Sequence, residues 1–461
     1  MNKILMRAGA TPFERFDDFD VLKNNPIGNN SGNLLFAHAV YKHLSRDNVN
    51  IDINNYKANP LDADQINEKY DAFVIPLANA FRPSFIKQLT PLTALVRKLK
   101  IPCVVVGVGA QADLVHGVTR IKDIDTDVKA FVSAVLDKSA SIGVRGDFTN
   151  EYLRGLGFSS VETIGCPSFY LNGDKLKIIK KPQPPAEISY NLTPKMPHKL
   201  GKFFERLVNS YPNHAYVAQD KADLELFLLN KIINLPVTDQ LPSTPTHASI
   251  LNGNAMLFSD VPSWINQMRQ YDFTIGTRIH GNMFSLHAGT PAFLIAHDSR
   301  TLELARYLKI PHRVSSDVDE RTTVDELYNE ADYTEMNNTQ AERFTRYRSF
   351  LKSNGLSDIW DSHGAEEEFD KRISLVRQSL PIRPTSSLEG DELYKRIASA
   401  LNYLHLDTER LRERLVKVER DNKKYSALNF LQMEERLKKL EDLADSRSSV
   451  SILGSFLKRG R

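Results

Sequence analysis

The sequence predicts an α/β protein with two lobes, each built on a parallel sheet, followed by a long C-terminal helix. Short apolar, β-branched runs alternate with stretches whose apolar residues recur at three-and-four spacing. This alternation is typical of parallel strands connected by covering helices. One proline-rich segment interrupts the alternation, and a separate helical pattern occupies the end of the chain. A length of 461 residues is sufficient for two or three domains.

The first lobe is expected over residues 1–180. Short apolar runs predict buried strands at 73–77, 103–107, 140–144 and 161–164. Amphipathic stretches predict helices at 83–99 and 128–136, and an apolar helix is expected at 34–44. Because strands and helices alternate, the strands should run parallel with helices on both faces of the sheet.

The second lobe is expected over residues 186–384. The segment KKPQPP, residues 180–185, cannot continue a helix or a central strand and therefore marks the boundary. The alternation then resumes, with strands expected at 188–191, 215–218, 273–277 and 292–296 and helices at 198–210, 224–229, 281–288 and 301–308. We expect two Rossmann-like lobes that bind ligands in the crevice at the carboxyl ends of their strands.

Residues 385–445 predict a long amphipathic helix with coiled-coil character. Residues 391–445 contain no Gly or Pro and hold 12 basic and 12 acidic side chains. Apolar residues follow four-three heptad spacing at Leu401, Leu404, Leu411, Leu415 and Val418. We expect this helix to form a homo-oligomer interface, and docking of the same apolar seam on the chain's own lobes is the alternative.

The composition narrows the class of protein. Hydrophobic residues make up 41% and charged residues 25%, and the net charge is only +3, which argues against a nucleic-acid partner. Neither a signal peptide nor a membrane span is expected. With only Cys103 and Cys166 in the chain, a cytoplasmic, reducing compartment is favoured. The basic tail at 446–461 predicts either a frayed end or peripheral contact with the inner face of the membrane.

The most informative segment is FTIGTRIHG, residues 273–281. If residues 273–279 form a strand, Arg278 and His280 project to one face, and Gly281 permits a turn into a helix capped by Asn282. An Arg and a His at a strand's end beside a helix N-terminus would favour an anion. The simpler interpretation, in which His280 braces the turn and Arg278 pairs with a surface acid, stays open.

A matching element, SIGVRGDF, occurs in the first lobe. The expected strand ends at Arg145, Gly146 permits a turn, and Asp147 is a good N-cap for the next helix. Arginines from two lobes could hold one small polyanion across the cleft, because guanidinium suits carboxylate and phosphate. Pairing of Arg145 with Asp147 or with solvent is the simpler alternative.

Two glycine-bearing loops could add backbone amides to such a site. GNNSGN contributes Gly28, Asn30 and Asn33, and GVGAQ contributes Gly109 and Gln111. Neither loop is a dinucleotide or Walker motif, and plain turns would look the same. Because no HExxH motif, Cys/His cluster or G-x-S-x-G elbow occurs, neither a metal nor a serine nucleophile is expected.

Several motifs occur in a distinctive order: GNNSGN, VIPLANAF, PCVVVGVGAQ, SIGVRGDF, ETIGCPSFYL, ISYNLT and FTIGTRIHGNMFSLHAGTPAFLI, followed by HDSR. Over residues 28–311 this order resembles the polysaccharide pyruvyl transferase family. The resemblance implies a GT-B-like architecture, phosphoenolpyruvate as donor substrate, no cofactor, and a saccharide acceptor that is free or lipid-linked. The implied reaction places the enolpyruvyl-derived unit on a sugar as a pyruvate ketal and releases phosphate.

The same resemblance implies roles for individual residues. Arg145 and Arg278 would hold phosphoenolpyruvate, and His280 would perform acid/base chemistry. Asp298 and Arg300, in HDSR, would join the substrate-binding set. The sequence departs from the family where Gly-Cys-Pro-Ser, including Cys166, replaces the frequent Gly-Asp-Pro-Ala, and where Arg300 replaces a common Lys.

Two other functions would use the same features. A GT-B glycosyltransferase would place the diphosphate of a nucleotide sugar at the same helix-end sites, and it would bind or hydrolyse UDP- or GDP-sugars. A catalytically inactive scaffold would use its long helix to assemble a polysaccharide-synthesis complex. The scaffold would release no phosphate and would tolerate replacement of His280.

Overall fold

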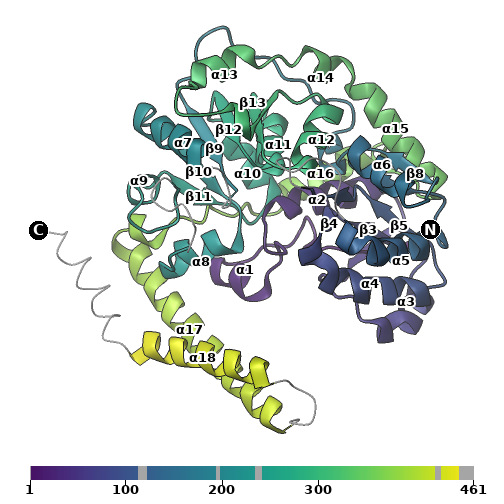
Figure 1. Cartoon of the computed structure of the whole chain (residues 1–461), viewed down its shortest axis with the longest axis horizontal. Coiled ribbons are helices and arrows are strands. Elements are labelled where there is room, and N and C mark those ends of the chain that lie inside the picture. Colours follow the sequence, from purple (N-terminus) through teal and green to yellow (C-terminus); the bar gives the residue numbers. More distant parts are fainter. Residues whose placement is uncertain (1, 113–121, 194–197, 234–240, 421–426, 446–461) are drawn as a thin grey trace, which may run out of the picture. The chain divides into compact units, whose positions relative to one another are not determined.

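The computed structural model describes residues 2–112, 122–193, 198–233, 241–420 and 427–445. Residues Met1–Ser386 form one compact unit and residues Ser387–Arg461 form a second. The first unit contains two main parallel sheets, of four and six strands, and two short two-stranded sheets, with helices packed around them (Figure 1). The predicted α/β class with two Rossmann-like lobes is therefore confirmed.

The first sheet has the strand order β2-β1-β3-β5, and all its pairs are parallel. Its strands are β1 (Lys3–Met6), β2 (Asn50–Ile53), β3 (Ala72–Pro76) and β5 (Cys103–Val106). Just past β5, Val108 pairs with Val144 of β7 (Ile142–Val144), which pairs with β8 (Val161–Thr163). The prediction misses β1 and β2 because KILM and NIDI are too short to show a clear period.

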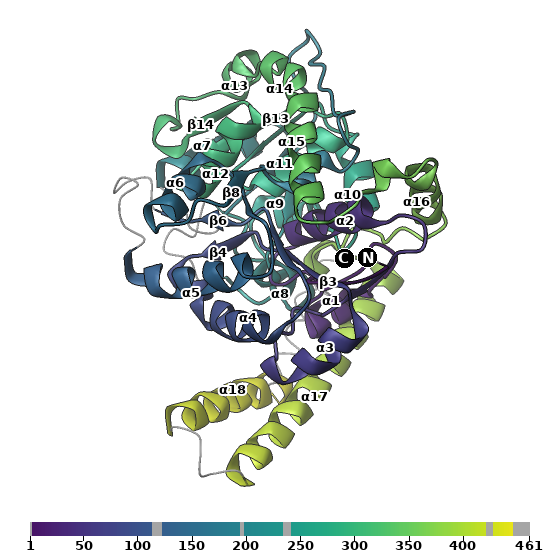
Figure 2. The ribbon, with the colours of Figure 1, turned by 90° about the vertical axis from the view of Figure 1, so that its right-hand side faces the viewer.

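Helices lie on both faces of this sheet. Figures 1 and 2 show α3 (Ala63–Lys69), α4 (Ile86–Lys98) and α5 (Asp125–Leu136) grouped on one face. Phe73 and Ile75 of β3 belong to the same buried apolar cluster as Leu92 and Leu95 of α4. On the other side, α2 (Gly32–Leu44) contacts both β3 and the second-lobe helices α10 (Val261–Met268) and α11 (Ile279–His287). Helix α2 therefore lies between the two lobes.

The second sheet has the parallel order β11-β10-β9-β12-β13-β14. The predicted strands correspond to β9 (Ile188–Asn191), β10 (Ala215–Ala218), β12 (Phe273–Gly276) and β13 (Ala292–Ala296), whereas the outer strands β11 (Ala255–Leu257) and β14 (His312–Val314) are not predicted. The connecting helices include α7 (His198–Ser210), α8 (Lys221–Leu229), α11 and α12 (Ser299–Leu308). The carboxyl ends of these parallel strands meet at one edge, where a site is expected.

Two helices late in the first unit return to the first lobe. In α15 (Gln340–Ser353) the Tyr347 hydroxyl lies 2.8 Å from Nδ1 of His43, which is on α2. Phe369 of α16 (Ala365–Ser374) contacts the ring of Tyr41, also on α2. The lobe boundaries of 1–180 and 186–384 stay a prediction, and the structure adds that residues 340–374 pack on the first lobe.

The second unit contains two helices. The 31-residue α17 (Gly390–Arg420) is the expected long helix, but the expectation that it continues to residue 445 is wrong. A second helix, α18 (Ala427–Asp445), packs against α17, and Arg412 of α17 binds Glu441 of α18 at 3.0 Å. In one continuous helix these residues would be about 44 Å apart. Part of the apolar seam therefore has an intramolecular partner, which the heptad pattern alone does not reveal.

None of the described helices combines the length and apolarity required to cross a bilayer. The predicted basic tail at 446–461 lies outside the described residues. Along α17, Leu411 is buried but Leu401 is 51% exposed. An apolar surface on this helix thus remains for the predicted oligomer interface.

Truncation after Pro384 tests that interface. We expect the full-length chain to form a dimer or higher oligomer, and the truncated chain to be an active monomer, because the first unit holds both sheets. Light scattering on both forms, with activity measured in parallel, checks the expectation. A monomeric full-length chain, or a truncated chain that aggregates, would instead support docking of the seam on the lobes.

Candidate functional site

A cavity of about 560 Å³ lies between the two lobes and is lined from both. Cavities of this size hold small-molecule ligands. The first-lobe lining comes from residues that follow strands, from the loop before α2 and from one side of α2 and α4 (Ile86–Lys98), and the second-lobe lining comes from the loops after β9, β10, β12 and β13. The cavity is thus at the carboxyl ends of the strands, where parallel sheets bind ligands.

The structure brings nearly all the predicted site residues to this cavity. Its lining includes Gly28, Asn30, Asn33, Gln111 and Arg145 from the first lobe and Arg278, His280, Asp298 and Arg300 from the second. The exception is Gly109, which lies behind the lining. A Cβ there would be 3.0 Å from Cδ of Arg145, so this glycine leaves room for the Arg145 side chain.

Arg145 follows β7 directly and is only 1% exposed. Its Nε donates to the carbonyl of Gly107 at 2.8 Å, and its guanidinium lies 5.6 Å from the ring centre of Phe36. No described carboxylate lies within ion-pair distance of it, so the alternative pairing with Asp147 is not found in the described part of the chain. Burial lowers the pKa of Arg145, but a guanidinium stays charged in proteins. A buried cation without an ion-pair partner indicates an anion-binding position.

His280 lies on the first turn of α11, beside Arg145. Its Nε2 is 3.5 Å from Sγ of Cys166, and a Cβ on Gly32 would be 2.8 Å from its own Cβ. Burial lowers the pKa of His280 well below its usual 6.5, and the positive charges of Arg145, Arg300 and Arg278 lower it further. The imidazole is therefore neutral at physiological pH and can accept a proton.

The prediction for the strand that carries Arg278 and His280 is wrong in detail. Strand β12 ends at Gly276 and α11 begins at Ile279, so the two side chains do not alternate along a strand. Asn282 lies inside the helix, where its Nδ2 donates to the Gly276 carbonyl at 3.1 Å. The early turn arises because the side chain of Asn191 packs against Gly276 and accepts from the backbone N–H of Arg278 at 2.9 Å. In the first lobe, likewise, the N-cap is Gly146, and Asp147 is the first helical residue.

Replacement of Gly276 by Ala tests this packing. The added Cβ would lie 2.1 Å from Oδ1 of Asn191, so we expect a loss of stability of about 2 kcal/mol and displacement of Arg278. Denaturant unfolding measures the loss. Gly155→Ala is the matched control, because its Cβ meets nothing within 4 Å in α6 (Asp147–Gly155) and should be neutral or slightly stabilising. Equal stability of both variants would contradict this packing.

Arg278 lines the cavity, but its guanidinium is engaged. One nitrogen pairs with Asp220, and Nε donates to the carbonyl of Leu192 at 2.7 Å. Asp220 also accepts from Asn30 of the first lobe at 3.2 Å. The ion-pair interpretation of Arg278 is therefore correct, although its partner lies in the cavity lining. An anion that reaches Arg278 must compete with Asp220, whereas Arg145 carries no such competitor.

Asp298 and Arg300 lie at the start of α12. Asp298 caps the helix by accepting from the Thr301 N–H at 2.8 Å, and it binds Arg300 at 3.1 Å. Burial raises the pKa of Asp298, but Arg300, His297 and the bonds from Thr301 outweigh burial, so the net pKa is below its usual value. Asp298 is therefore a carboxylate that orients Arg300 at the cavity edge.

Sequence reasoning missed several lining residues, including Arg7, Arg82, Asp220 and His297. Arg7 directly follows β1, and Arg82 directly follows β4 (Asn79–Phe81). The signal that could have found both is the one that identified Arg145, an arginine immediately after a strand. Applying it to them required recognition of two very short strands.

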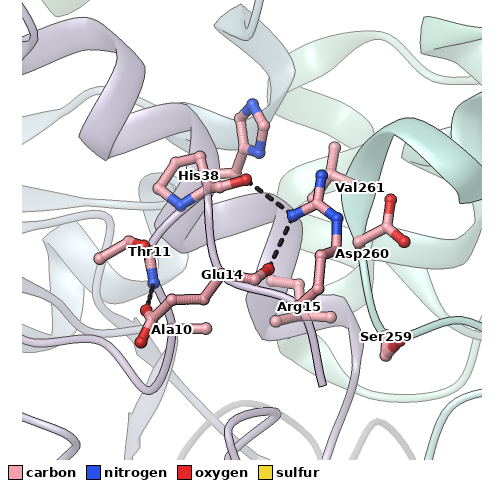
Figure 3. Close-up of a pocket in the computed structure, with 10 residues that line it drawn as sticks. Ala10, Thr11, Glu14, Arg15, His38, Ser259, Asp260 and Val261 are labelled. Atoms are coloured by element: carbon pink, nitrogen blue, oxygen red, sulfur yellow. Dashed lines mark hydrogen bonds between the residues drawn. The ribbon is translucent and has the colours of Figure 1, made fainter. Parts of the chain in front are cut away.

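The other features give no second site. The pocket in Figure 3 measures only about 20 Å³, which is space for about one water molecule. Its Arg15 donates to the carbonyls of Pro12 at 2.9 Å and Glu14 at 2.7 Å, which holds the loop after β1 in place. Across the described ranges, no group of three or more His, Cys, Asp and Glu side chains could hold a metal ion.

The fold and the cavity define a two-lobed α/β protein whose lobes enclose a cavity lined by several arginines. A family model described as polysaccharide pyruvyl transferase matches residues 30–299, more than half of the chain. The chain therefore belongs to the polysaccharide pyruvyl transferase family, as its motifs predict.

Comparison with solved structures gives only distant likenesses, and comparison with curated proteins gives no match. A UDP-GlcNAc 2-epimerase from Neisseria meningitidis is 11% identical, with a TM-score of 0.36, and the match covers 81% of this chain and 99% of the epimerase. HepE from Anabaena, bound to UDP and glucose, is 11% identical with a TM-score of 0.37 over 81% and 100%. A functionally uncharacterised Klebsiella pneumoniae protein is 12% identical with a TM-score of 0.35 over 66% and 88%. The family assignment does not rest on these values.

Proposed function

We propose that this protein transfers the enolpyruvyl-derived unit of phosphoenolpyruvate onto a saccharide, forms a pyruvate ketal and releases phosphate. The observation that carries the proposal is the buried Arg145, which has no described carboxylate within ion-pair distance, beside the neutral His280. Phosphoenolpyruvate offers a carboxylate and a phosphate, the two groups that guanidinium binds best. Family membership supports the same reaction.

The reaction balances without an oxidant or reductant. Two hydroxyl oxygens of the acceptor form bonds to C2 of the donor, and the bond between C2 and the phosphate oxygen breaks. One hydroxyl proton is matched by the proton that converts the donor methylene to a methyl group, and the other leaves with phosphate. The protein must therefore move protons and stabilise charge on the departing phosphate.

His280 is suited to the proton transfers. It is neutral in the empty cavity and can take a proton from an attacking hydroxyl. A bound dianionic phosphate and a carboxylate offset the charges of the neighbouring arginines, so donor binding raises the pKa of His280. The same imidazole can then carry the proton and return it during the reaction.

The arginines would divide the anionic groups of the donor between them. Arg145 is the strongest candidate because it lacks a competing carboxylate, and Arg300 is held at the cavity edge by Asp298. Arg278 contributes positive charge at His280 while Asp220 fixes its position. Stabilisation of the phosphate as it departs is the step in which these charges act most strongly.

Turnover with phosphoenolpyruvate tests the proposal. The full chain is incubated with the donor and a panel of free and lipid-linked saccharides, phosphate release is followed, and acceptor mass is read. We expect phosphate release together with an acceptor heavier by one carboxyethylidene unit, with or without a chelator. Parallel arms with UDP-glucose and GDP-mannose test for a glycosyltransferase. Sugar transfer in those arms, or no product in any arm, would contradict the proposal.

A further inference from the structure

The cavity lining also holds a cationic subsite whose arginine is not among those that lower the pKa of His280. This Arg7 subsite consists of Arg7, Tyr56 and Phe85, all of which line the cavity. The guanidinium centre of Arg7 is 4.9 Å from the ring centre of Tyr56 and 5.8 Å from that of Phe85. Within the described residues, the side chain of Arg7 makes a long hydrogen bond, from Nη1 to the carbonyl of Pro76 at 3.4 Å.

Arg7 has no ion-pair partner among the described residues, and burial lowers its pKa. Taking a guanidinium out of water is unfavourable unless charged or polar groups replace the water. Aromatic faces and one long bond to a carbonyl offset only part of that cost. A ligand that brings negative charge to this part of the cavity would offset the remainder.

A tight turn fixes the position of Tyr56, because Asn55 and Tyr56 both have positive φ and the N–H of Lys57 donates to the Asn54 carbonyl at 2.9 Å. The φ of Tyr56 is +57°, in the left-handed region that bulky residues rarely occupy. Two glycines make room for the ring, because a Cβ on Gly9 or on Gly28 would lie 2.5 or 2.9 Å from Cε2 of Tyr56. The left-handed conformation costs about 1–2 kcal/mol at a non-glycine residue, and the turn holds the ring in one position. Here it places an aromatic face beneath Arg7.

The loop GNNSGN connects this subsite with the proposed reaction centre. Gly28, at the start of the loop, packs against Tyr56, and Gly32, four residues later, packs against His280. The two ends of the loop therefore contact two adjacent parts of one cavity. A ligand that extends from His280 along this loop would reach Arg7.

The donor does not require Arg7. The positive charges that act on His280 come from Arg145, Arg300 and Arg278, whereas the ionisable group that interacts with Arg7 is Tyr56. Arg145 and Arg300 already offer two guanidinium groups for the carboxylate and phosphate of one phosphoenolpyruvate. The cavity, at about 560 Å³, also has space for a second ligand beside the donor.

We infer that the Arg7 subsite binds an anionic group of the acceptor, so that the acceptor is a saccharide bearing a phosphate or a carboxylate next to the sugar that is pyruvylated. This inference rests on the proposed function for the identity of the acceptor as the second ligand. The anion could be a glycosyl phosphate or a uronate, and both would form charge-assisted bonds to guanidinium.

Equilibrium binding tests the subsite without requiring turnover. Glucose 1-phosphate, glucuronic acid and methyl glucoside are titrated into the full chain without phosphoenolpyruvate, so that no reaction occurs, and heats of binding are recorded. We expect the wild type to bind one of the charged sugars at least 10-fold more tightly than methyl glucoside. Preference for the phosphate or for the uronate identifies the source of the anion. Equal binding of all three sugars would overturn the inference.

Variants of Arg7 complete the test. Arg7→Ala should abolish the preference for the charged sugar and leave binding of methyl glucoside and phosphoenolpyruvate unchanged, and Arg7→Lys should restore part of the preference. Arg97→Ala is the matched control, because Arg97 is an exposed residue of α4 and its replacement also removes one positive charge. This variant should bind all three sugars and phosphoenolpyruvate as the wild type does. Weakened binding of phosphoenolpyruvate, or equal weakening for charged and neutral sugars, would overturn the inference. Failure of turnover alone would affect only the proposed function.

Discussion

Replacement of Arg145 by Ala is expected to lower kcat/KM for phosphoenolpyruvate by about 100-fold or more. The side chain is buried, lies beside His280 and has no described carboxylate partner, so its charge is available to the donor. Loss of a charged contact of about 3 kcal/mol corresponds to this factor. Steady-state kinetics with varied donor measures the effect.

Two further variants test whether the loss in Arg145→Ala comes from the missing guanidinium or from disturbed folding. Arg145→Lys should recover only part of the loss, because Lys lacks the planar fork of guanidinium. Arg97→Ala, on the exposed face of α4, should retain wild-type kinetics. Wild-type donor kinetics in Arg145→Ala would show that the donor is held elsewhere in the cavity.

Replacement of His280 by Ala is expected to lower turnover by about 10²–10⁴-fold, the usual contribution of a positioned proton-transfer group. Folding and donor affinity should remain, since Arg145 and Arg300 are unaffected. Saturating-donor kinetics and a donor titration measure the two quantities separately. Near-normal turnover of His280→Ala would show that another group performs the proton transfer. Asp298, which lines the cavity, would be tested next. His287 is a weaker candidate than Asp298, because its Nε2 donates to the Ser168 carbonyl at 2.6 Å and it does not line the cavity.

The pH dependence of kcat/KM and of kcat also tests the proton-transfer role of His280. In the free enzyme the pKa of His280 lies well below 6.5, so the basic form is already present at neutral pH. As pH falls, kcat/KM should stay level through 6.5 and decline only where His280 becomes protonated. The bound anions raise this pKa, so kcat should decline at a higher pH than kcat/KM. An acid limb of kcat/KM at or above pH 6.5 that is absent in His280→Ala would contradict the assignment.

Much of the fold follows from short-range patterns. Buried parallel strands such as β9, β10 and β13 are continuous apolar runs bounded by turn residues, and the sequence locates them to the residue. The edge strand β2 and the short β1 carry too few apolar residues for any period to emerge. Strand β12 ends early because Asn191, a residue distant in sequence, occupies the space beside Gly276.

Part of the candidate site could also be predicted, because some of its residues directly follow strands that the sequence reveals. Arginines that follow recognised strands are predictable, so Arg145 is found, and Arg7 is missed along with β1. The pairing of Arg278 with Asp220 depends on the proximity of the loops after β10 and β12, which no local pattern encodes. The return of α18 along α17 depends likewise on long-range ion pairs, such as Arg412 with Glu441.

The central claim is that the cavity between the lobes binds phosphoenolpyruvate through Arg145. The most direct measurement is an equilibrium titration of phosphoenolpyruvate into the full-length wild type, Arg145→Ala and the Arg97→Ala control. We predict saturable binding to the wild type and the control, and binding at least 100-fold weaker to Arg145→Ala. Equal affinity in all three proteins, or no binding to the wild type, would contradict the claim.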